Sequence, residues 1–255
     1  MLPFFYFYTF NYRMKVAIIG FGKMGQAIKT LAEKENHEVS LIIDRNNSQD
    51  FTSEKLQGID VAFEFSEPGE ASGNVMKLLQ SGVSVVCGTT GWTIETDLIN
   101  KVCSEKGIAF FHASNFSPGT WMFFRLNEWF AKQMTGTAYE VSIREKHHIH
   151  KKDKPSGTAI TLANYICQGN PSFTGWKPDN DFSCGNKIPV SSVREGEIAG
   201  IHTSVWDSDY DTIEITHTAK NRAIFAQGAM MAATLIQGKT GIFNMSHILS
   251  EYFNL

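Results

Sequence analysis

The most constraining feature of this sequence is the regular alternation of short apolar runs with helix-like stretches in its first half. Residues 15–19 (KVAII) are an apolar, β-branched run typical of a buried parallel strand, and residues 26–36 (QAIKTLAEKEN) have a helical pattern. The alternation continues with strand-like and helix-like segments at 39–44, 59–66, 73–82, 84–91, 96–107 and 108–117. Strands and helices that alternate at this spacing predict a parallel sheet covered by helices.

A glycine-rich loop joins the first predicted strand to the first predicted helix. Gly20, Gly22 and Gly25 have the spacing GxGxxG, in which one glycine makes the turn, one admits a pyrophosphate and one lets helix and strand pack closely. The phosphates of such ligands bind at the start of the helix. Residues 14–117 are therefore predicted to form a Rossmann-type dinucleotide-binding domain, with a pyrophosphate at Gly20, Phe21, Gly22, Lys23, Met24 and Gly25.

The second predicted strand ends at an acidic residue. Asp44 lies 19 residues after Gly25, where a carboxylate can accept hydrogen bonds from the adenosine ribose hydroxyls. The alternative is that Asp44 caps a turn. Arg45 follows directly and could instead contact a 2′-phosphate, so the cofactor is NADH or NADPH.

Ligands of parallel sheets bind beyond the carboxyl ends of the strands. The loops expected there include FSEP, GTTGW and ASNFS. Their alternative role is turn formation, because Gly, Thr, Ser and Asn are common in turns. We expect contacts with the nicotinamide end of the cofactor from Gly88, Thr89, Thr90, Ala113, Ser114, Asn115 and Phe116.

The pattern changes after residue 117. Residues 121–134 are predicted to form an amphipathic helix, and residues 138–148, 197–207 and 210–220 alternate apolar and polar side chains as strands do. We therefore expect an α+β second domain at 118–230 with a mixed, mostly antiparallel sheet, one face of which must be covered by helices or by another subunit. Residues 231–255 are predicted to form C-terminal helices.

Residues 144–158 (REKHHIHKKDKPSGT) concentrate histidines and basic residues. The histidine spacing is poor for zinc, no cysteine is near, and the run lacks the interleaved aromatics of a nucleic-acid patch. A solvated loop is the plainest alternative. Against it, Pro155 and Ser156 begin a helical pattern, so the backbone of Gly157 and Thr158 would face an anion. Together with Lys151 this predicts a site for a small carboxylate, without a metal.

Composition excludes several classes of protein. A formal net charge of −3 argues against a general polyanion binder, and four scattered cysteines argue against a disulfide scaffold. Residues 1–13 are aromatic but lack the features of a signal peptide; because Met14 follows, we expect them to be an upstream extension outside the fold. A membrane or partner anchor is the alternative. The protein is expected to be soluble and cytoplasmic, without nucleic-acid or membrane partners.

The run EKHHIHKKDKPSGTA resembles the signature of the dihydrodipicolinate reductase family. The segments GFGKMG, CGTTGW, ASNFSPG, REGEIAGIHT and EITHTAKNR are also similar to that family, in its order, so that the resemblance covers residues 14–255. It implies an NADH- or NADPH-dependent reductase that converts a cyclic dicarboxylate, 4-hydroxy-tetrahydrodipicolinate, to tetrahydrodipicolinate in diaminopimelate and lysine biosynthesis.

The resemblance also implies roles for single residues. His147 would act as general acid/base and Lys151 as proton donor, and Arg222 would lie on the cofactor side. The substrate carboxylates would be held by His148, Ser156, Gly157 and Thr158. The family further implies a homotetramer joined through the second domain's sheet, and a C-terminal tail that returns to the first domain. The alternatives are another two-domain dehydrogenase, acting on aspartate or homoserine, and a non-catalytic NAD(P)-sensing protein.

Overall fold

The computed structural model describes residues 13–179, 185–221 and 223–253. The chain divides into two compact units, one containing the residues up to Phe116 together with Phe225–Leu255 and the other Ser117–Ile224. The boundary predicted from the sequence at residue 230 lies six residues beyond the second division. The predicted extension, residues 1–13, lies outside the described residues except for Arg13.

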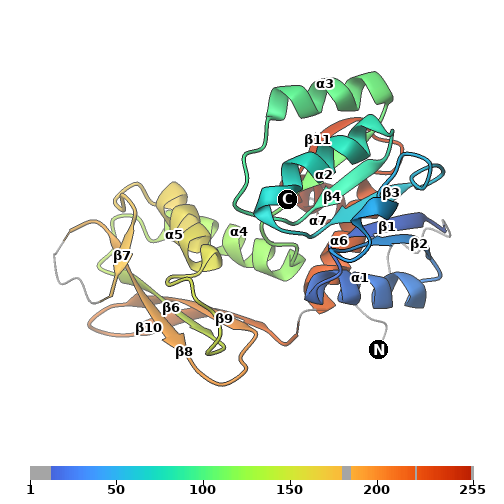
Figure 1. Ribbon diagram of the computed structural model, residues 1–255. Helices are drawn as coiled ribbons and strands as arrows, with labels where there is room; N and C mark the ends of the chain where they lie inside the picture. Colours follow the sequence, from blue (N-terminus) through green and yellow to red (C-terminus); the bar gives the residue numbers. More distant parts are fainter. Residues whose placement is uncertain (1–12, 180–184, 222, 254–255) are drawn as a thin grey trace. The chain divides into compact units, whose positions relative to one another are not determined.

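The first unit contains a six-stranded sheet in the order β11-β5-β4-β3-β1-β2, and every pairing in it is parallel (Figure 1). The order reverses after β1, as in the Rossmann-type fold that the sequence predicts. The strands are β1 (Lys15–Ile19), β2 (Glu38–Ile43), β3 (Val61–Glu64), β4 (Ser84–Cys87), β5 (Ala109–His112) and β11 (Gly241–Phe243). The helices are α1 (Lys23–Lys34), α2 (Pro68–Gln80), α3 (Thr96–Lys106), α6 (Ala223–Leu235) and α7 (Met245–Phe253), with a short 3₁₀ turn, η2 (Ser48–Asp50).

Helices cover both faces of this sheet (Figure 1). Ala17 and Ile19 belong to one core with Val75 and Leu78 of α2 and Ile99 of α3. Successive residues of a strand point to opposite faces, so that the residues between them in β1 face the other side, where α1 packs. The strands are buried on both faces, which is why they are almost wholly apolar.

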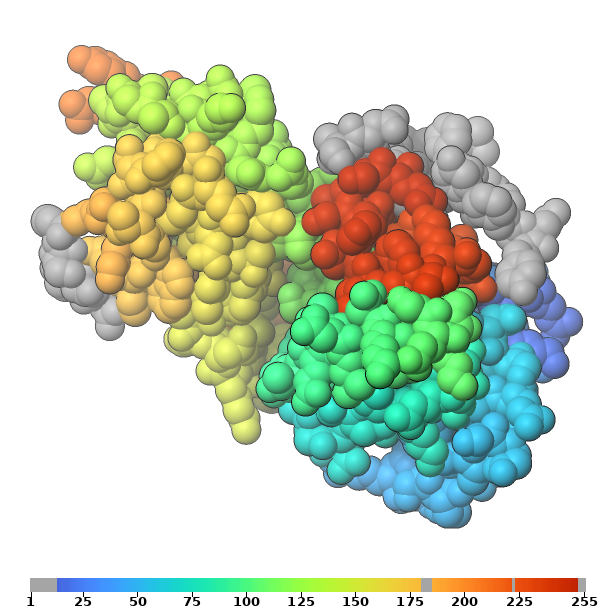
Figure 2. All heavy atoms as spheres, turned by 90° about the horizontal axis from the view of Figure 1, so that it is seen from above, coloured from blue at the N-terminus to red at the C-terminus, as the bar shows by residue number. Residues whose placement is uncertain are grey.

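The C-terminal segment completes the first unit. Its strand β11 pairs in parallel with β5, and Ile242 stands opposite Phe110. Figure 2 shows these red C-terminal residues beside the green residues of α3. The sequence predicts helices in this segment, and α6 and α7 are present, but it does not reveal β11. Three residues are too few to give a recognisable alternation.

The second unit contains a five-stranded sheet in the order β10-β9-β6-β8-β7 (Figure 1). The pairs β10·β9 and β6·β9 are antiparallel, whereas β6·β8 and β7·β8 are parallel, so the sheet is mixed as predicted. The strands are β6 (Glu140–His147), β7 (Trp176–Pro178), β8 (Ile188–Arg194), β9 (Gly200–Asp207) and β10 (Thr212–Ala219), and the helices are α4 (Pro118–Gln133) and α5 (Gly157–Gly169). The sequence does not predict β7 or β8.

Helices α4 and α5 cover one face of the second sheet. Phe124 of α4 and Leu162 of α5 share a core with Val141 and Ile143 of β6 and Trp206 of β9. In the described part of the chain, no helix is both long enough and apolar enough to cross a membrane.

Candidate active site

The glycine loop is shaped partly by the protein's own packing. Gly20 has φ +92°, and a Cβ there would lie 2.3 Å from the carbonyl oxygen of Phe65. A Cβ on Gly25 would lie 2.3 Å from the carbonyl oxygen of Gly20, because α1 packs closely on β1. A Cβ on Gly22, in contrast, would meet no protein atom within 4 Å. Gly22 therefore leaves open the approach that a pyrophosphate needs.

The start of α1 is suited to an anion. Gly22 is the N-cap residue, and neither a side-chain cap nor an acidic residue in the first turn is present. The first N–H groups of a helix lack partners within it, and the helix dipole favours negative charge there. The exposed side chain of Lys23 adds a cation at the same end. These residues fit the phosphates of a dinucleotide.

Asp44 follows β2, as predicted for the ribose end of the cofactor. Its Oδ1 accepts a hydrogen bond from the backbone N–H of Asn46 at 2.7 Å, so it also caps a turn. The sequence left these two roles as alternatives, but the structure allows both, since a carboxylate has a second oxygen. The exposed guanidinium of Arg45 is paired with Glu67, the N-cap residue of α2.

A buried carboxylate lies at the carboxyl ends of β3 and β4. Glu64 is fully buried; its Oε1 accepts a hydrogen bond from the N–H of Ser66 at 3.3 Å and its Oε2 accepts one from the Cys87 thiol at 3.3 Å. Burial and the neighbouring Glu64 carboxylate raise the pKa of the Cys87 thiol far above its ordinary value. Cys87 is therefore a hydrogen-bond donor here and not a nucleophile.

The loop that begins at Gly88 is tied to its neighbours through Thr89. The Oγ1 of Thr89 accepts a hydrogen bond from the N–H of Ser66 at 3.0 Å, and its carbonyl oxygen accepts one from Nε1 of Trp92 at 2.9 Å. The Nε2 of His112 lies 3.4 Å from the same carbonyl oxygen. These contacts join the ends of β3, β4 and β5 into one rigid edge where a ligand of a parallel sheet would bind.

The other residues predicted to contact the cofactor at this edge differ in their surroundings. Thr90 and Ser114 are exposed, whereas Ala113 and Phe116 are buried. The Phe116 ring packs 5.5 Å from that of Phe65, so its side chain belongs to the core. Contact between these residues and the cofactor stays a prediction. Arg222 lies outside the described residues.

The second unit places three buried polar side chains together on the helix-covered face of its sheet. Glu145 and His147 alternate along β6, and Glu145 stands opposite His202 of β9. The Nδ1 of His147 lies 3.1 Å from Oε2 of Glu145, and the Nε2 of His202 lies 3.7 Å from the same oxygen. The two imidazole rings are 4.9 Å apart and nearly perpendicular.

The second oxygen of Glu145 is held by other groups. Oε1 accepts hydrogen bonds from NH2 of Arg194 at 3.0 Å and from the backbone N–H of Ser156 at 3.1 Å. Burial alone would raise the pKa of the Glu145 carboxyl, but hydrogen bonds from His147, Ser156, Ser192 and Arg194 outweigh it and hold the pKa far below its usual value. Glu145 is thus a buried carboxylate that stays ionised.

His202, in contrast to Glu145, is a buried side chain that stays uncharged. Burial, reinforced by the neighbouring His147, lowers the pKa of His202 to about 3, against the attraction of Glu145. Its Nε2 lies 3.2 Å from Oγ of Ser156. A neutral imidazole therefore contacts the hydroxyl at the start of α5.

Helix α5 begins where the sequence predicts an anion site. Ser156 is its N-cap residue, and its Oγ accepts a hydrogen bond from the N–H of Ala159 at 3.2 Å. Gly157 is exposed and Thr158 is half-buried, so the first turn reaches the surface of the unit. No acidic residue lies in that turn. A carboxylate placed there would meet the positive end of the helix dipole.

Lys151 lies in a loop that hydrogen bonds from Arg194 connect to the sheet. The Lys151 Nζ lies 2.9 Å from Oδ1 of Asp153, and Nε of Arg194 donates to the Lys151 carbonyl oxygen at 3.2 Å. Arg194 also donates to the Asp153 carbonyl oxygen. One guanidinium thus contacts both this loop and Glu145, and it fixes Lys151 in the same region as the histidines.

The histidines of residues 144–158 have different surroundings in the structure. His147 is buried in the cluster, whereas the exposed His150 lies 3.5 Å from Glu197, and the ring of His148 lies 6.1 Å from that of His150. The backbone N–H of His148 donates to the Ile198 carbonyl oxygen at 2.8 Å. A substrate contact from His148 stays a prediction.

Among the described residues, Glu145, His147 and His202 form the one group of potential metal ligands, with their ligand atoms within 4.8 Å of one another. The spacing of the histidines in the sequence does not reveal this group, because His202 comes from another strand. A cation there would lie next to the Arg194 guanidinium on Glu145, which repels it. The arrangement is better suited to a carboxylate–imidazole hydrogen-bond network.

Sequence reasoning assigned no role to Glu145, Arg194 or His202. Period-two alternation in a predicted strand could have paired Glu145 with His147 on one face. Arg194 gave no such signal, since β8 was not predicted. The fold and the site together are those of a two-unit protein with a Rossmann-type first unit and a buried carboxylate–imidazole cluster in the second.

The family models for the two halves of dihydrodipicolinate reductase match this chain. The N-terminal model matches residues 14–116 and the C-terminal model residues 119–249. The chain belongs to the dihydrodipicolinate reductase family, and it is an oxidoreductase.

Curated relatives and solved structures agree with this assignment. A 4-hydroxy-tetrahydrodipicolinate reductase of Christiangramia forsetii is 41% identical over 243 residues, covering 94% of this chain and 99% of the relative. A 4-hydroxy-tetrahydrodipicolinate reductase of Nitrosomonas eutropha is 32% identical, and the match covers 92% of this chain and 98% of the relative. The dipicolinate-bound dihydrodipicolinate reductase of Paenisporosarcina sp. TG-14 has a TM-score of 0.73 and 25% identity, covering 93% of this chain and 100% of its own. An amine dehydrogenase of Mycobacterium smegmatis shares the fold alone. Its TM-score is 0.61 at 9% identity, and the match covers 92% of this chain and 95% of that protein.

Proposed function

We propose that this chain reduces 4-hydroxy-tetrahydrodipicolinate to tetrahydrodipicolinate, with NADH or NADPH, in diaminopimelate and lysine biosynthesis. The observation that carries the proposal is the buried cluster of Glu145, His147 and His202 at the start of α5, with Lys151 in the adjoining loop. The relatives named for this reaction, and the neighbour bound to dipicolinate, support a small dicarboxylate as the substrate.

The chain's own residues supply the proton and the counter-charge. A bound dihydronicotinamide supplies the hydride. Loss of the 4-hydroxyl as water, together with a proton from the neighbouring ring carbon, leaves a conjugated imine. The electron pair that the hydride displaces into this imine needs a proton, which Lys151 Nζ donates, and His147 acts as general acid/base for the proton exchange. Over the whole reaction the substrate gains one hydride and one proton and loses one water molecule.

The substrate carboxylates are held at the N-terminus of α5. The backbone of Gly157 and Thr158, the hydroxyls of Ser156 and Thr158 and the imidazole of His148 provide hydrogen bonds there. The helix dipole and the Lys151 ammonium offset the two negative charges. These groups stabilise charge without reorganising during the reaction.

The test is the loss of coenzyme absorbance with substrate formed in situ from aspartate semialdehyde, pyruvate and a dihydrodipicolinate synthase. His147→Ala and Lys151→Ala are expected to lower turnover by roughly 10²- to 10⁴-fold, the range of a lost acid/base group. His150→Ala is the matched control, because His150 is exposed in the same loop. If the wild-type protein binds coenzyme but oxidises none, the proposal is wrong and a coenzyme-sensing role or another substrate becomes the better explanation.

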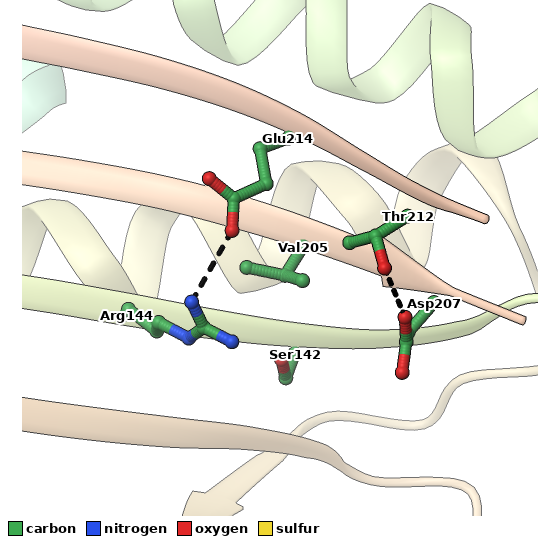
Figure 3. A pocket seen from close by; sticks show the side chains of 6 residues that line it. All are labelled: Ser142, Arg144, Val205, Asp207, Thr212 and Glu214. Carbon is green, nitrogen blue, oxygen red and sulfur yellow. Dashed lines mark hydrogen bonds and ion pairs between the residues drawn. The ribbon is translucent and has the colours of Figure 1, made fainter.

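The oligomer is proposed from the face of the second sheet that α4 and α5 do not cover. It has a hollow of about 670 Å³ lined by Val205 and by polar side chains of β6, β9 and β10, namely Ser142, Arg144, Asp207, Thr212 and Glu214 (Figure 3). The Nη1 of Arg144 lies 3.2 Å from Oε1 of Glu214 across this face. We place a second copy of the chain there, within a homotetramer. Sedimentation analysis tests this, and a monomer at micromolar concentration would overturn it.

We infer that the reaction takes place in the cytoplasm. Cys87, Cys103 and Cys167 are free thiols, which suits a reducing compartment, and reduced nicotinamide coenzymes are available there.

A further inference from the structure

The two oxygens of the Glu145 carboxylate have different surroundings. Oε1 is saturated by Arg194 and by the N–H of Ser156, at 3.0 and 3.1 Å. Oε2 faces the two imidazoles, with Nδ1 of His147 at 3.1 Å. Glu145 is therefore fixed by its first oxygen and presents the second to His147.

Neither of the facing atoms has a hydrogen bond to another described residue. Within the described residues, Oε2 of Glu145 and Nδ1 of His147 are both buried, and neither has a well-aligned hydrogen bond, although they are only 3.1 Å apart. Each is the chemical complement of the other, a carboxylate acceptor and an N–H donor. Such contacts are commonly misaligned in enzymes without substrate and tighten when it binds.

His202 does not compete for this oxygen. Its Nε2 is 3.7 Å from Oε2 of Glu145 but 3.2 Å from Oγ of Ser156. A hydroxyl has two acceptor lone pairs and one proton, so the Ser156 Oγ can accept from the N–H of Ala159 and still pair with Nε2 of His202. Nε2 of His202 is thus closer to Ser156 than to Oε2 of Glu145, which is left to His147.

The other nitrogen of His147 lies on the side of Gly200. A Cβ at Gly200 would stand 3.0 Å from Nε2 of His147, tighter than ordinary contact. The glycine therefore keeps the Nε2 side of the ring free of a side chain. We propose that Glu145 is a positioning residue that holds His147 in the tautomer with its proton on Nδ1, so that Nε2 exchanges the proton in catalysis. This proposal rests on the proposed role of His147.

The effect of Glu145 on the reaction should therefore run through His147. Glu145→Gln keeps the shape of the side chain but can point its amide N–H at Nδ1, which favours the wrong tautomer. We expect kcat to fall roughly 10- to 100-fold, below the full 10²–10⁴ of a lost acid/base group, with KM changed less than about threefold. Glu145→Asp, which keeps the charge, should recover part of the loss.

The decisive comparison is a double-mutant cycle. In the His147→Ala background, Glu145→Gln should lower kcat less than about threefold further, because the group it positions is gone. Equal losses in both backgrounds would overturn the proposal, since they would mean that Glu145 supports the fold or the substrate independently. Glu140→Gln, an exposed change on the same strand, is the control and should leave kcat unchanged.

A measurement without activity or mutation separates this proposal from the proposed function. Nitrogen-15 NMR of histidine-labelled wild-type protein reports which ring nitrogen of His147 carries the proton. The expected result is protonated Nδ1 and bare Nε2, whether or not the substrate is correctly identified. The opposite tautomer would overturn the proposal.

Discussion

Gly20 and Gly22 differ in what an added methyl group would meet, and this difference predicts opposite phenotypes. In Gly20→Ala the Cβ would lie 2.3 Å from the Phe65 carbonyl oxygen, in a residue with φ +92°. The unfavourable backbone conformation alone costs about 1–2 kcal/mol, and relief of the clash requires a backbone shift. We expect a loss of about 2–4 kcal/mol in the free energy of unfolding, which lowers Tm by roughly 5–15 °C for a chain of this size.

Gly22→Ala should leave the fold nearly intact. Its Cβ would meet no protein atom within 4 Å, and the residue has φ −76°, which alanine adopts readily. We expect a loss of about 1 kcal/mol in the free energy of unfolding, because alanine is a poorer N-cap residue than glycine. Coenzyme binding should weaken at least about tenfold, or about 1.4 kcal/mol, because the methyl group occupies the approach of the pyrophosphate.

Thermal unfolding and titration of NADH fluorescence measure the two effects on the same samples. The structure places the first clash of a Gly20 side chain within the protein, at the Phe65 carbonyl oxygen. Wild-type coenzyme affinity in Gly22→Ala would refute the position assigned to the pyrophosphate. A wild-type Tm in Gly20→Ala would refute the packing argument.

Three further changes have expected outcomes. Glu67→Gln frees Arg45 from its ion pair, so KM for NADPH should fall several-fold while KM for NADH changes little, as measured by coenzyme oxidation. His202 has its pKa lowered to about 3, against about 6.5 unfolded, so the stability it contributes is present above pH 6.5 and is lost as pH falls. Below pH 6, proton uptake by His202 on unfolding should lower the free energy of unfolding, measured with urea, by up to about 1.4 kcal/mol per pH unit. His202→Gln should remove this part of the pH dependence. Ser156→Ala removes the α5 cap and should lower the free energy of unfolding by about 1 kcal/mol, with Ser156→Gly closer to wild type in a thermal melt.

The first unit is largely predictable from the sequence because its signals are local. Each buried strand is a short apolar run, and each helix has its own amphipathic pattern, so β1 to β5 and α1 to α3 were all anticipated. The exception is β11, whose three residues gain their strand geometry from pairing with β5. That partner lies more than 100 residues earlier, and local reasoning does not reach it.

The candidate site was predictable only where its residues are neighbours in the sequence. His147, Lys151 and Ser156 stand in one motif, whereas Arg194 and His202 come from strands that meet β6 across the sheet. Arg194 shows why the second group was missed. Its role depends on the parallel pairing of β8 with β6, and the sequence around it does not alternate clearly.

The same pairing explains why a buried carboxylate is tolerated at the centre of the site. An isolated Glu145 in this position would take up a proton, since burial raises the pKa of a carboxyl. Arg194 is brought to Oε1 because His147 stands opposite Arg194 in the register of β6 and β8, and the start of α5 adds the N–H of Ser156. Because Arg194 and the N–H of Ser156 occupy Oε1, the other carboxylate oxygen, Oε2, is left to face Nδ1 of His147. The pairings of β6 with β8 and β9, which the sequence does not reveal, thus place the groups that hold Glu145 against Nδ1 of His147, a residue that the sequence does predict.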